Sequence, residues 1–442
     1  QTLAQKYDVV VTNPPYMGAS NMNPKLNEFI KQNYTDYKSD FFSAFIVKCS
    51  SMAKPEGYCG LFTPYVWMFI QSYEKLRQYL YQQATLETLI QFEYSAFEEA
   101  TVPVCTFTFS NRYVNKKGNY LRLVDFRGGM EVQRQKTLEA IANHDCGFYY
   151  EQSTDNFAKI PGSPVAYWLS DKSIAAFEKG CALGTLENVC GGLTTGDNNR
   201  FLRFWFEVTL SSISFQTNSM EETEKSNFTW YPMTKGGEYR KWYGNNEYVV
   251  NWKNNGEEIK YWVTHNPKDP NTKQWSRRLF NTESYFKHII TWSGISSGAP
   301  SMRVASHSIF GSGAKAIVSE RKDDFYIGYL NSSVALMYLR VLSPTLNYES
   351  GHIASLPIIL AEDEGISIVV QKNIDLSKQD WDSFETSWDF TRHPFIKAIT
   401  KYPHMMDVGN IYLAECYDIW AGECEERFEK LKANEEELNR IF

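Results

Sequence analysis

The feature that most constrains the fold is a short apolar segment that ends abruptly in two prolines. Residues 9–12 read Val-Val-Val-Thr and are followed by Asn13-Pro14-Pro15-Tyr16. A β-branched run of this kind predicts a buried parallel strand. Proline has no N–H to donate to a neighbouring strand and restricts the residue before it, so the strand must end at Asn13. The sequence therefore predicts a rigid turn at the carboxyl end of a strand, where α/β sheets place their chemistry.

Asn-Pro-Pro-Tyr directly after such a strand resembles the catalytic motif of the amino-methyltransferases, which transfer a methyl group from S-adenosylmethionine to an exocyclic or amide nitrogen. The resemblance implies that the catalytic residues are Asn13, Pro14, Pro15 and Tyr16. An adenine N6 amine is a poor nucleophile because its lone pair is delocalised into the ring. The carbonyls of Asn13 and Pro14 can each accept one N6 hydrogen and so favour methyl transfer. Tyr16 offers an aromatic face for a base taken out of the duplex. A proline turn that carries no chemistry is the plain alternative.

Length and composition limit the remaining possibilities. A chain of 442 residues is long enough for two or three domains, and its 43% hydrophobic content is sufficient for buried cores. No apolar run reaches the roughly 20 residues that a membrane span needs, so we expect no membrane partner. The eight cysteines show no C-x-x-C spacing and the seven histidines show no ligand spacing. This pattern favours free thiols in a cytoplasmic protein and predicts no bound metal.

The pattern after the proline motif continues an α/β fold. Apolar spacing predicts helices at 40–52 and 72–83, and strands at 58–63, 86–92 and 104–109. Strands that alternate with helices are typical of a doubly wound sheet. We therefore expect residues 1–150 to form the second, catalytic half of a doubly wound, Rossmann-like methyltransferase sheet.

Two aromatic residues and one glycine-rich segment each have two interpretations. Tyr65 and Trp67 follow the strand that ends at residue 63, and they either wall a base pocket or pack in the core. Residues 309–313, Ile-Phe-Gly-Ser-Gly, superficially resemble the glycine turn that holds S-adenosylmethionine, but the residues after them favour a β-turn. In family members whose target recognition comes last, the cofactor motifs precede Asn-Pro-Pro-Tyr. We therefore expect the main S-adenosylmethionine-binding motifs upstream, and we interpret the chain as a piece of a larger protein.

From about residue 150 the composition changes. Prolines and a glycine at 157–168 indicate a domain junction, and seven of the twelve tryptophans fall between Trp205 and Trp292. The whole chain has a net charge of −7, but residues 190–330 hold 17 Lys+Arg against 14 Asp+Glu, a net of +3. A near-neutral module with local basic residues is compatible with DNA contact, although a single surface cation is more often simply solvated. The candidate DNA-binding residues are Thr195, Asn198, Arg200, Arg203, Arg240, Lys241, Arg277, Arg278 and Arg303.

A more specific resemblance extends over nearly the whole chain. Residues 192–203, Gly-Leu-Thr-Thr-Gly-Asp-Asn-Asn-Arg-Phe-Leu-Arg, look like the opening of the target-recognition domain in adenine methyltransferases that carry their own specificity module. Residues 330–333, Leu-Asn-Ser-Ser, followed by residues 346–353 and by Leu356-Pro357, look like the closing segment of that domain. Together with an acidic, helical tail, these segments make the chain similar to the PglX family, the adenine-specific DNA methyltransferases of BREX phage-defence systems.

This second resemblance implies both an activity and a domain organisation. The activity is N6-adenine methylation of double-stranded DNA at an asymmetric host site, which marks self DNA, alongside other BREX proteins. The expected domains are the catalytic half at 1–150, an α+β target-recognition domain at 151–360, and a helical C-terminal spacer segment at 361–442.

Three alternatives stay open at this point. Methyltransferases that modify protein glutamine or RNA share the Asn-Pro-Pro-Tyr motif, but they seldom carry some 200 residues of recognition module after it. A fused restriction–modification enzyme adds a nuclease, and Glu320-Arg-Lys322 matches half of a nuclease pattern at the level of chance. A recognition module with a defunct methylase would bind DNA only, and the intact Asn13 and Tyr16 count against that reading.

Overall fold

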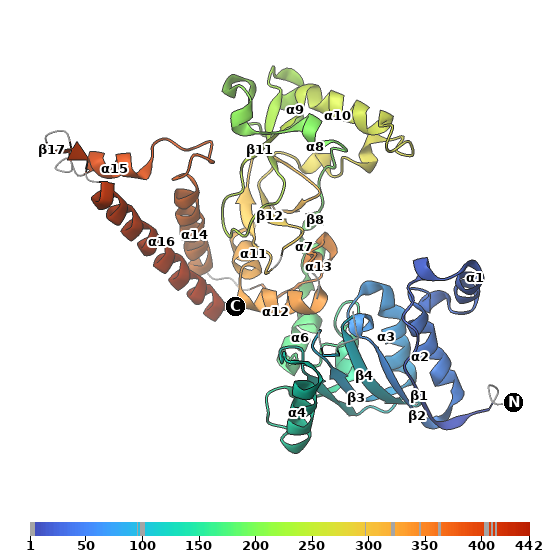
Figure 1. Cartoon of the computed structure of the whole chain (residues 1–442). Helices are drawn as coiled ribbons and strands as arrows, with labels where there is room; N and C mark the ends of the chain where they lie inside the picture. Colours follow the sequence, from blue (N-terminus) through green and yellow to red (C-terminus); the bar gives the residue numbers. More distant parts are fainter. Residues whose placement is uncertain are drawn as a thin grey trace. The chain divides into compact units, whose positions relative to one another are not determined.

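The computed structural model describes residues 5–94, 96–97, 102–296, 298–319, 323–343, 346–360, 364–401, 406–407, 410–411 and 413–442. The chain forms two compact units, Gln1–Cys181 with Val341–Pro344 and Ala182–Arg340 with Thr345–Phe442 (Figure 1). Helices and several sheets alternate in it, which confirms a mixed α/β architecture. Among the described residues, no helix is long and apolar enough to span a membrane. The half nuclease pattern at 320–322 lies outside the described residues.

The first unit is built on a six-stranded sheet with the order β1-β2-β4-β3-β5-β6. Its strands are β1 (Tyr7–Thr12), β2 (Ala53–Pro64), β3 (Thr85–Gln91), β4 (Val104–Ser110), β5 (Lys117–Arg122) and β6 (Tyr149–Ser153). Its helices are α1 (Pro24–Asn33), α2 (Phe41–Met52), α3 (Glu74–Gln83), α4 (Gly129–Ala142), α5 (Thr154–Ala158) and α6 (Asp171–Lys179). The pairs β1–β2 and β3–β5 are parallel, and the other pairs are antiparallel. The helices and strands that the apolar spacing predicts between residues 40 and 109 are therefore present, with ends shifted by a few residues.

Strand β1 forms an edge of this sheet, and its only strand partner among the described residues is β2. Val9 and Val11 are 59% and 74% exposed, whereas Val10 packs against the core. The prediction of a buried strand is therefore wrong for this chain. The physical reason is that α2 covers one face of β1 while the other face and the free edge meet solvent.

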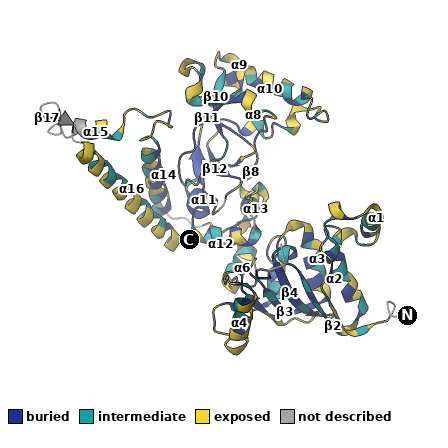
Figure 2. Ribbon diagram, viewed as in Figure 1, coloured by how far each residue is buried: buried dark blue, intermediate teal, exposed yellow. Residues whose placement is uncertain are grey.

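Helix α2 anchors the sheet beside the proline motif. The side chain of Asp40 caps its N-terminus by accepting a hydrogen bond from the backbone N–H of Phe42 at 3.2 Å. The helix then buries Phe42, Ile46 and Cys49 against the sheet. Figure 2 shows the resulting buried layer between the sheet and helices α2 and α3. Burial of such apolar side chains is the main term that stabilises this unit.

The second unit carries two four-stranded sheets, with the orders β14-β10-β11-β9 and β13-β12-β15-β8. Its strands are β8 (Asn188–Cys190), β9 (Leu202–Phe204), β10 (Trp230–Thr234), β11 (Tyr248–Asn251), β12 (Ile289–Ser293), β13 (Arg303–Ala305), β14 (Ile309–Phe310) and β15 (Ala314–Val318), with β7 (Cys181–Ala182), β16 (Pro357–Ile358), β17 (Met406–Asp407) and β18 (Asn410–Ile411) outside these sheets. Its helices are α7 (Leu183–Leu186), α8 (Asn198–Phe201), α9 (Met220–Lys225), α10 (Lys253–His265), α11 (Asp323–Leu330), α12 (Ser333–Leu342), α13 (Ser350–Ala354), α14 (Glu364–Trp381), α15 (Pro394–Lys401) and α16 (Leu413–Ile441). Tryptophans 242, 252 and 292 are fully buried here and form core, whereas the other four tryptophans of the segment 205–292 are at least partly exposed.

The C-terminal helices pack within the second unit. Helix α14 contacts both α11 and α16, and the ring of Phe442 lies 5.4 Å from that of Phe325 on α11. Two ion pairs reinforce this packing. Arg240 pairs with Asp380 at 3.2 Å, and Lys241 pairs with Glu435 at 2.7 Å. Much of α16 nevertheless remains exposed (Figure 2).

Candidate active site and nucleic-acid interface

The turn after β1 places the amide of Asn13 beside the hydroxyl of Tyr16. Asn13 and Pro15 are exposed, Pro14 is buried, and Tyr16 is 38% exposed. The Tyr16 hydroxyl oxygen lies 2.9 Å from Asn13 Oδ1 and 3.2 Å from the carbonyl oxygen of Phe62 on β2. The hydroxyl has a single proton, so it donates to one of these two acceptors at a time, and Asn13 Oδ1 is the nearer. This contact orients the Asn13 amide, and its second oxygen lone pair remains available to an external donor.

The surroundings of Tyr16 keep its hydroxyl protonated. Burial, with a smaller contribution from the neighbouring Cys105, raises the pKa of Tyr16 to about 12. The phenol is therefore a neutral donor throughout the physiological pH range. Its ring meets Phe42 edge to face, at 6.4 Å between ring centroids and 84° between ring planes. Sequence reasoning assigned Tyr16 a stacking role, and the structure adds the hydroxyl as the group that positions Asn13.

The segment after the motif is fixed by the N-terminus of α2. Oδ1 of Asp40 accepts hydrogen bonds from the backbone N–H of Met17 at 2.9 Å and of Phe42 at 3.2 Å. The N–H of Phe41 in turn donates to the carbonyl of Met17 at 3.0 Å. One carboxylate thus ties the residue after Tyr16 to the helix that packs under β1. Sequence reasoning missed Asp40, although its place as the N-cap residue of α2 was a readable signal.

The two aromatic residues after β2 have different environments. Trp67 is fully buried, donates through Nε1 to Thr63 Oγ1 at 3.2 Å, and lies 4.8 Å from the ring of Phe107. It is therefore a core residue in this structure. Tyr65 is half-buried at the edge of the same core. Of the two, only Tyr65 has surface that a ligand can reach.

In the second unit, Thr195 and Asn198 line a hollow between three loops. The Thr195 hydroxyl, itself buried, donates to Asn198 Oδ1 at 2.6 Å. The hollow has a volume of about 420 Å³, and Lys235 and the turn 311–313 complete its walls. That turn joins β14 to β15, so it is a connection between strands. The interpretation of 309–313 as a β-turn rather than a cofactor turn is consistent with this placement.

Most of the predicted DNA-binding cations already have partners within the second unit. Arg200 pairs with Glu258 at 2.8 Å, Arg240 with Asp380, Lys241 with Glu435, and Arg278 with Asp269 through Nε at 3.1 Å. Arg203 donates to the backbone carbonyls of Asn199 and Leu202 at 2.6 Å. Paired cations of this kind have a smaller electrostatic attraction for an external phosphate than free ones.

Arg303 and Arg277 lie at opposite extremes of exposure. Arg303 is 1% exposed on β13, and burial lowers the pKa of its guanidinium to about 10. Such a side chain cannot reach a ligand at the surface. Arg277 is exposed, and its side chain has no ion pair with the described residues. Lys268 and Lys273 share these two properties, and neither was among the DNA-binding residues predicted from the sequence.

The structure shows free cysteines throughout and no metal-ligand cluster in the described part of the chain. The eight thiols are unpaired. Within the described residues, no group of three or more His, Cys, Asp or Glu side chains is arranged to hold a metal ion.

A matched pair of glycines tests how closely the loop before Thr195 must pack. A Cβ at Gly192 would overlap the carbonyl oxygen of Phe310, to which the N–H of Leu193 donates at 3.0 Å, whereas a Cβ at Gly191 would meet nothing within 4 Å. We expect Gly192→Ala to lower the free energy of unfolding of this unit by about 3 kcal/mol, and Gly191→Ala to change it by less than about 0.5 kcal/mol. Hydrogen exchange of the β14 and β15 amides measures both effects. Equal protection in the two variants would contradict the close approach.

Comparison with known proteins identifies the relatives of this chain. Residues 2–97 match the Eco57I restriction-modification methylase family. The whole chain is 34% identical to the adenine-specific methyltransferase PglX of Lacticaseibacillus casei (strain Zhang), and 94% of it is 34% identical to the adenine-specific methyltransferase BrxX of Escherichia coli O9:H4 (strain HS). The chain is a homologue of PglX and BrxX. It spans 36% and 32% of the lengths of these relatives. The predicted resemblance to this family is therefore confirmed.

A solved structure shares the fold at much lower identity. The Type IIL restriction-modification enzyme MmeI, solved in complex with DNA, aligns with 98% of this chain and 53% of its own. The TM-score is 0.54 and the sequence identity is 12%. At this identity the likeness concerns the fold alone.

Proposed function

We propose that this chain provides the catalytic motif and the target-recognition part of a site-specific DNA methyltransferase that acts on adenine N6. The observation that carries the proposal is the Asn13–Tyr16 contact at the end of β1, in a homologue of adenine-specific methyltransferases. Taken together, these features support a methylase reading over that of a bare proline turn.

In the proposed reaction, the turn holds and polarises the target amine. One N6 hydrogen is donated to Asn13 Oδ1 and the other to the carbonyl oxygen of Pro14. Among the described residues, none donates a hydrogen bond to that carbonyl, so its capacity to accept one is unused within the chain. The two acceptors draw the nitrogen toward tetrahedral geometry and stabilise the positive charge that develops on it during transfer. The exposed face of Tyr16 supports the base, which must leave the helical stack to reach the turn.

The edge of β1 is where we propose that the other half of the methyltransferase sheet pairs. An exposed edge that carries two exposed valines is a ready template for another strand.

S-adenosylmethionine supplies an electrophilic methyl group in this chemistry. The described residues around Asn13 offer no glycine-rich strand-to-helix turn to hold it, and the turn at 311–313 belongs to the second unit. These residues therefore do not fit S-adenosylmethionine by themselves, and a cofactor site upstream of this chain stays a prediction.

The second unit is proposed to recognise the target duplex. The hollow lined by Thr195, Asn198 and Lys235 combines hydroxyl, amide and ammonium groups with exposed backbone, which are the groups that read base edges and phosphates. One carboxylate, that of Asp197, also lines it. Cooperation with other BREX proteins and a cytoplasmic location also stay predictions.

A recognition module without activity is the second candidate function, since the second unit forms the larger part of the chain. The preserved contact between Asn13 and Tyr16 favours the active enzyme, because a defunct site has no need of an oriented amide.

The proposed function predicts N6-methyladenine at one recurrent asymmetric motif in the genomic DNA of cells that carry the gene. We expect the modification to disappear when the gene is deleted and to return when it is restored. Long-read sequencing of the three strains measures this directly. If all three strains lack modified adenine while the neighbouring defence genes are present, the enzyme assignment fails and the binding-only function remains.

A further inference from the structure

A single loop of the second unit combines exposed cations with exposed aromatic rings. We define it as the basic loop, residues 266–280, which lies between α10 and β12 and reads Asn-Pro-Lys-Asp-Pro-Asn-Thr-Lys-Gln-Trp-Ser-Arg-Arg-Leu-Phe. It holds four cations and one acid, a net charge of +3. Trp275 and Phe280 are 38% and 44% exposed. Cations interleaved with aromatic residues are typical of surfaces that bind nucleic acid.

The basic loop is held in one conformation by its own side chains. Asp269 accepts from Arg278 Nε at 3.1 Å and from Thr272 Oγ1 at 2.8 Å, and these two bonds lower the pKa of its carboxyl. Oδ1 of Asn266 accepts from the N–H of Lys268 at 2.9 Å. Because Asn266 and Thr272 are also buried, the loop is a preformed surface that binds without a large ordering cost.

The ion pair between Arg278 and Asp269 uses one of the four cations of the basic loop, and the other three are exposed to solvent. Arg278 is neutralised by Asp269, whereas Lys268, Lys273 and Arg277 are exposed and make no ion pair within the described part of the chain. This distinguishes them from Arg200, whose guanidinium is paired with Glu258. Free cations are the ones that exchange their counterions for phosphates at no loss of an internal bond.

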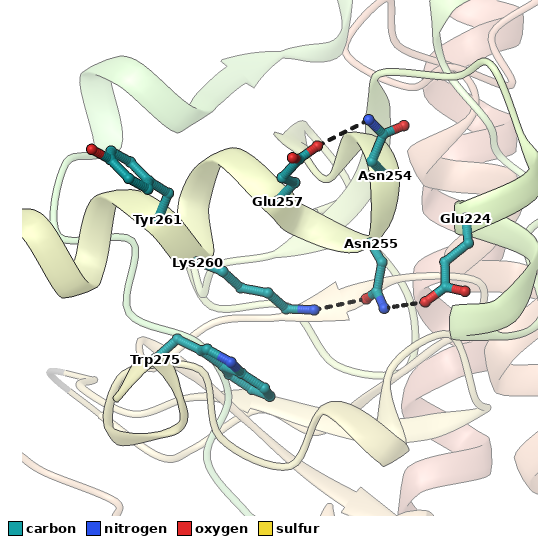
Figure 3. A pocket seen from close by; sticks show the side chains of 7 residues that line it. All are labelled: Glu224, Asn254, Asn255, Glu257, Lys260, Tyr261 and Trp275. Carbon is teal, nitrogen blue, oxygen red and sulfur yellow. Dashed lines mark hydrogen bonds between the residues drawn. The ribbon is translucent and has the colours of Figure 1, made fainter. Parts of the chain in front are cut away.

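An acidic hollow bounds this surface on the side of Trp275. Figure 3 shows Lys260 lying over Trp275, with its ammonium 4.9 Å from the ring centroid and 3.0 Å from Asn255 Oδ1. Asn255 in turn donates to Glu224 at 2.6 Å. The hollow of about 470 Å³ also exposes Glu257, so its two carboxylates repel a polyanion. Lys260 therefore contacts the ring of Trp275 at the edge of this hollow.

The basic loop adjoins the hollow that contains Thr195. The N–H of Thr194 donates to the carbonyl of Arg278 at 2.7 Å. A side chain at Gly196 would contact the Asn266 amide at 3.4 Å. The free cations thus lie on the same group of loops as the polar side chains proposed to face the bases.

We propose that the basic loop is the phosphate-contacting element of the DNA interface, with Lys268, Lys273 and Arg277 each neutralising one phosphate of the duplex. The inference rests on the proposed function of the second unit as a DNA-recognition module. Contacts of this loop to phosphates would set the affinity for DNA and the position of the protein along the duplex. Other side chains would select the bases, because phosphate contacts carry no direct sequence information.

The test is the salt dependence of binding to a short duplex of arbitrary sequence, measured by fluorescence anisotropy with the full chain. The variant combines Lys268→Gln, Lys273→Gln and Arg277→Gln. The matched control combines Lys287→Gln, Lys372→Gln and Lys397→Gln, which are also exposed and have no ion pair among the described residues. Three phosphate contacts predict that the slope of log affinity against log salt becomes less steep by about 2.7 in the variant. The slope of the control should stay at that of the wild type.

The possible results distinguish the role of the basic loop from the proposed DNA-recognition function of the second unit. A wild-type chain with salt-dependent binding and a variant that keeps its slope would overturn the role of the basic loop and leave the proposed function intact. A wild-type chain that binds no duplex would overturn both. Loss of slope in the control as well would show that the effect follows net charge alone, which also contradicts the assignment. Thermal melts verify folding, since the three side chains are exposed and their removal should leave the midpoint unchanged.

Discussion

Asn13→Ala is expected to reduce methylation of the recurrent adenine motif by about 10²- to 10³-fold while binding to duplex DNA is unchanged. Removing one preorganised hydrogen-bond acceptor from a reacting group costs a rate factor of this size when water is excluded from the site. Asn13 is exposed at the end of β1 and its amide contacts Tyr16, so its removal leaves the core of the first unit intact. Sequencing of genomic DNA gives the methylated fraction, and anisotropy with a duplex gives the binding.

Two further variants test whether the loss of methylation depends on the Asn13 amide and on its hydrogen bond to Tyr16. Asn33→Ala removes another exposed asparagine of the first unit, whose side chain donates only to the carbonyl of Phe29, and we expect methylation to stay within a factor of two or so of wild type. Tyr16→Phe keeps the ring but loses the bond to Asn13, which is worth about 1 kcal/mol and predicts a loss of roughly fivefold. An Asn13→Ala protein with normal methylation would remove the turn from the mechanism.

Local patterns in the sequence were sufficient to predict β1, α2, β2, α3, β3 and β4 of the first unit, whereas α1, β5, α4 and β6 were not predicted. The proline pair after Thr12 marks the end of β1, and the apolar spacing at 40–52 marks α2, because both signals depend on neighbouring residues only. The same patterns could not show that Val9 and Val11 are exposed. Exposure depends on which strand lies next to β1, and this is a property of the tertiary arrangement.

The candidate interface of the second unit shows why single cations are hard to assign from sequence. Arg240 and Lys241 were plausible DNA contacts until the fold paired them with Asp380 and Glu435, which lie 140 and 194 residues further along the chain. No local pattern contains that information. The basic loop was detectable in principle, since its three free cations and Trp275 lie within ten residues. Only Arg277 and Arg278 of that loop were chosen, and the structure shows that Arg278 is neutralised.

Arg77 is a residue of the first unit whose loss should strongly lower stability. It is fully buried on α3 and donates to three backbone carbonyls. The acceptors are Trp67 at 2.6 Å, Ile70 at 2.9 Å, and Gly162 at 3.0 Å from Nε and 2.6 Å from Nη2. Burial lowers the pKa of the guanidinium, and the carbonyl dipoles compensate for its desolvation. The side chain thus fixes the segment that follows β2 to a distant loop.

We expect Arg77→Met to lower the free energy of unfolding of the first unit by about 3–5 kcal/mol, because three carbonyl groups lose their buried donor while the methionine restores only the apolar volume. Arg112→Met is the matched control. Arg112 pairs with Glu56 at 2.8 Å with 63% of its side chain exposed, and its loss should cost less than about 1 kcal/mol. Hydrogen exchange of the β2 and β4 amides reports opening of this unit alone, with a predicted acceleration of about 10²- to 4 × 10³-fold in Arg77→Met. Equal exchange in the two variants would mean that water replaces the guanidinium. The segment after β2, which begins three residues beyond the Phe62 carbonyl that faces Tyr16, would then not depend on Arg77 for its position.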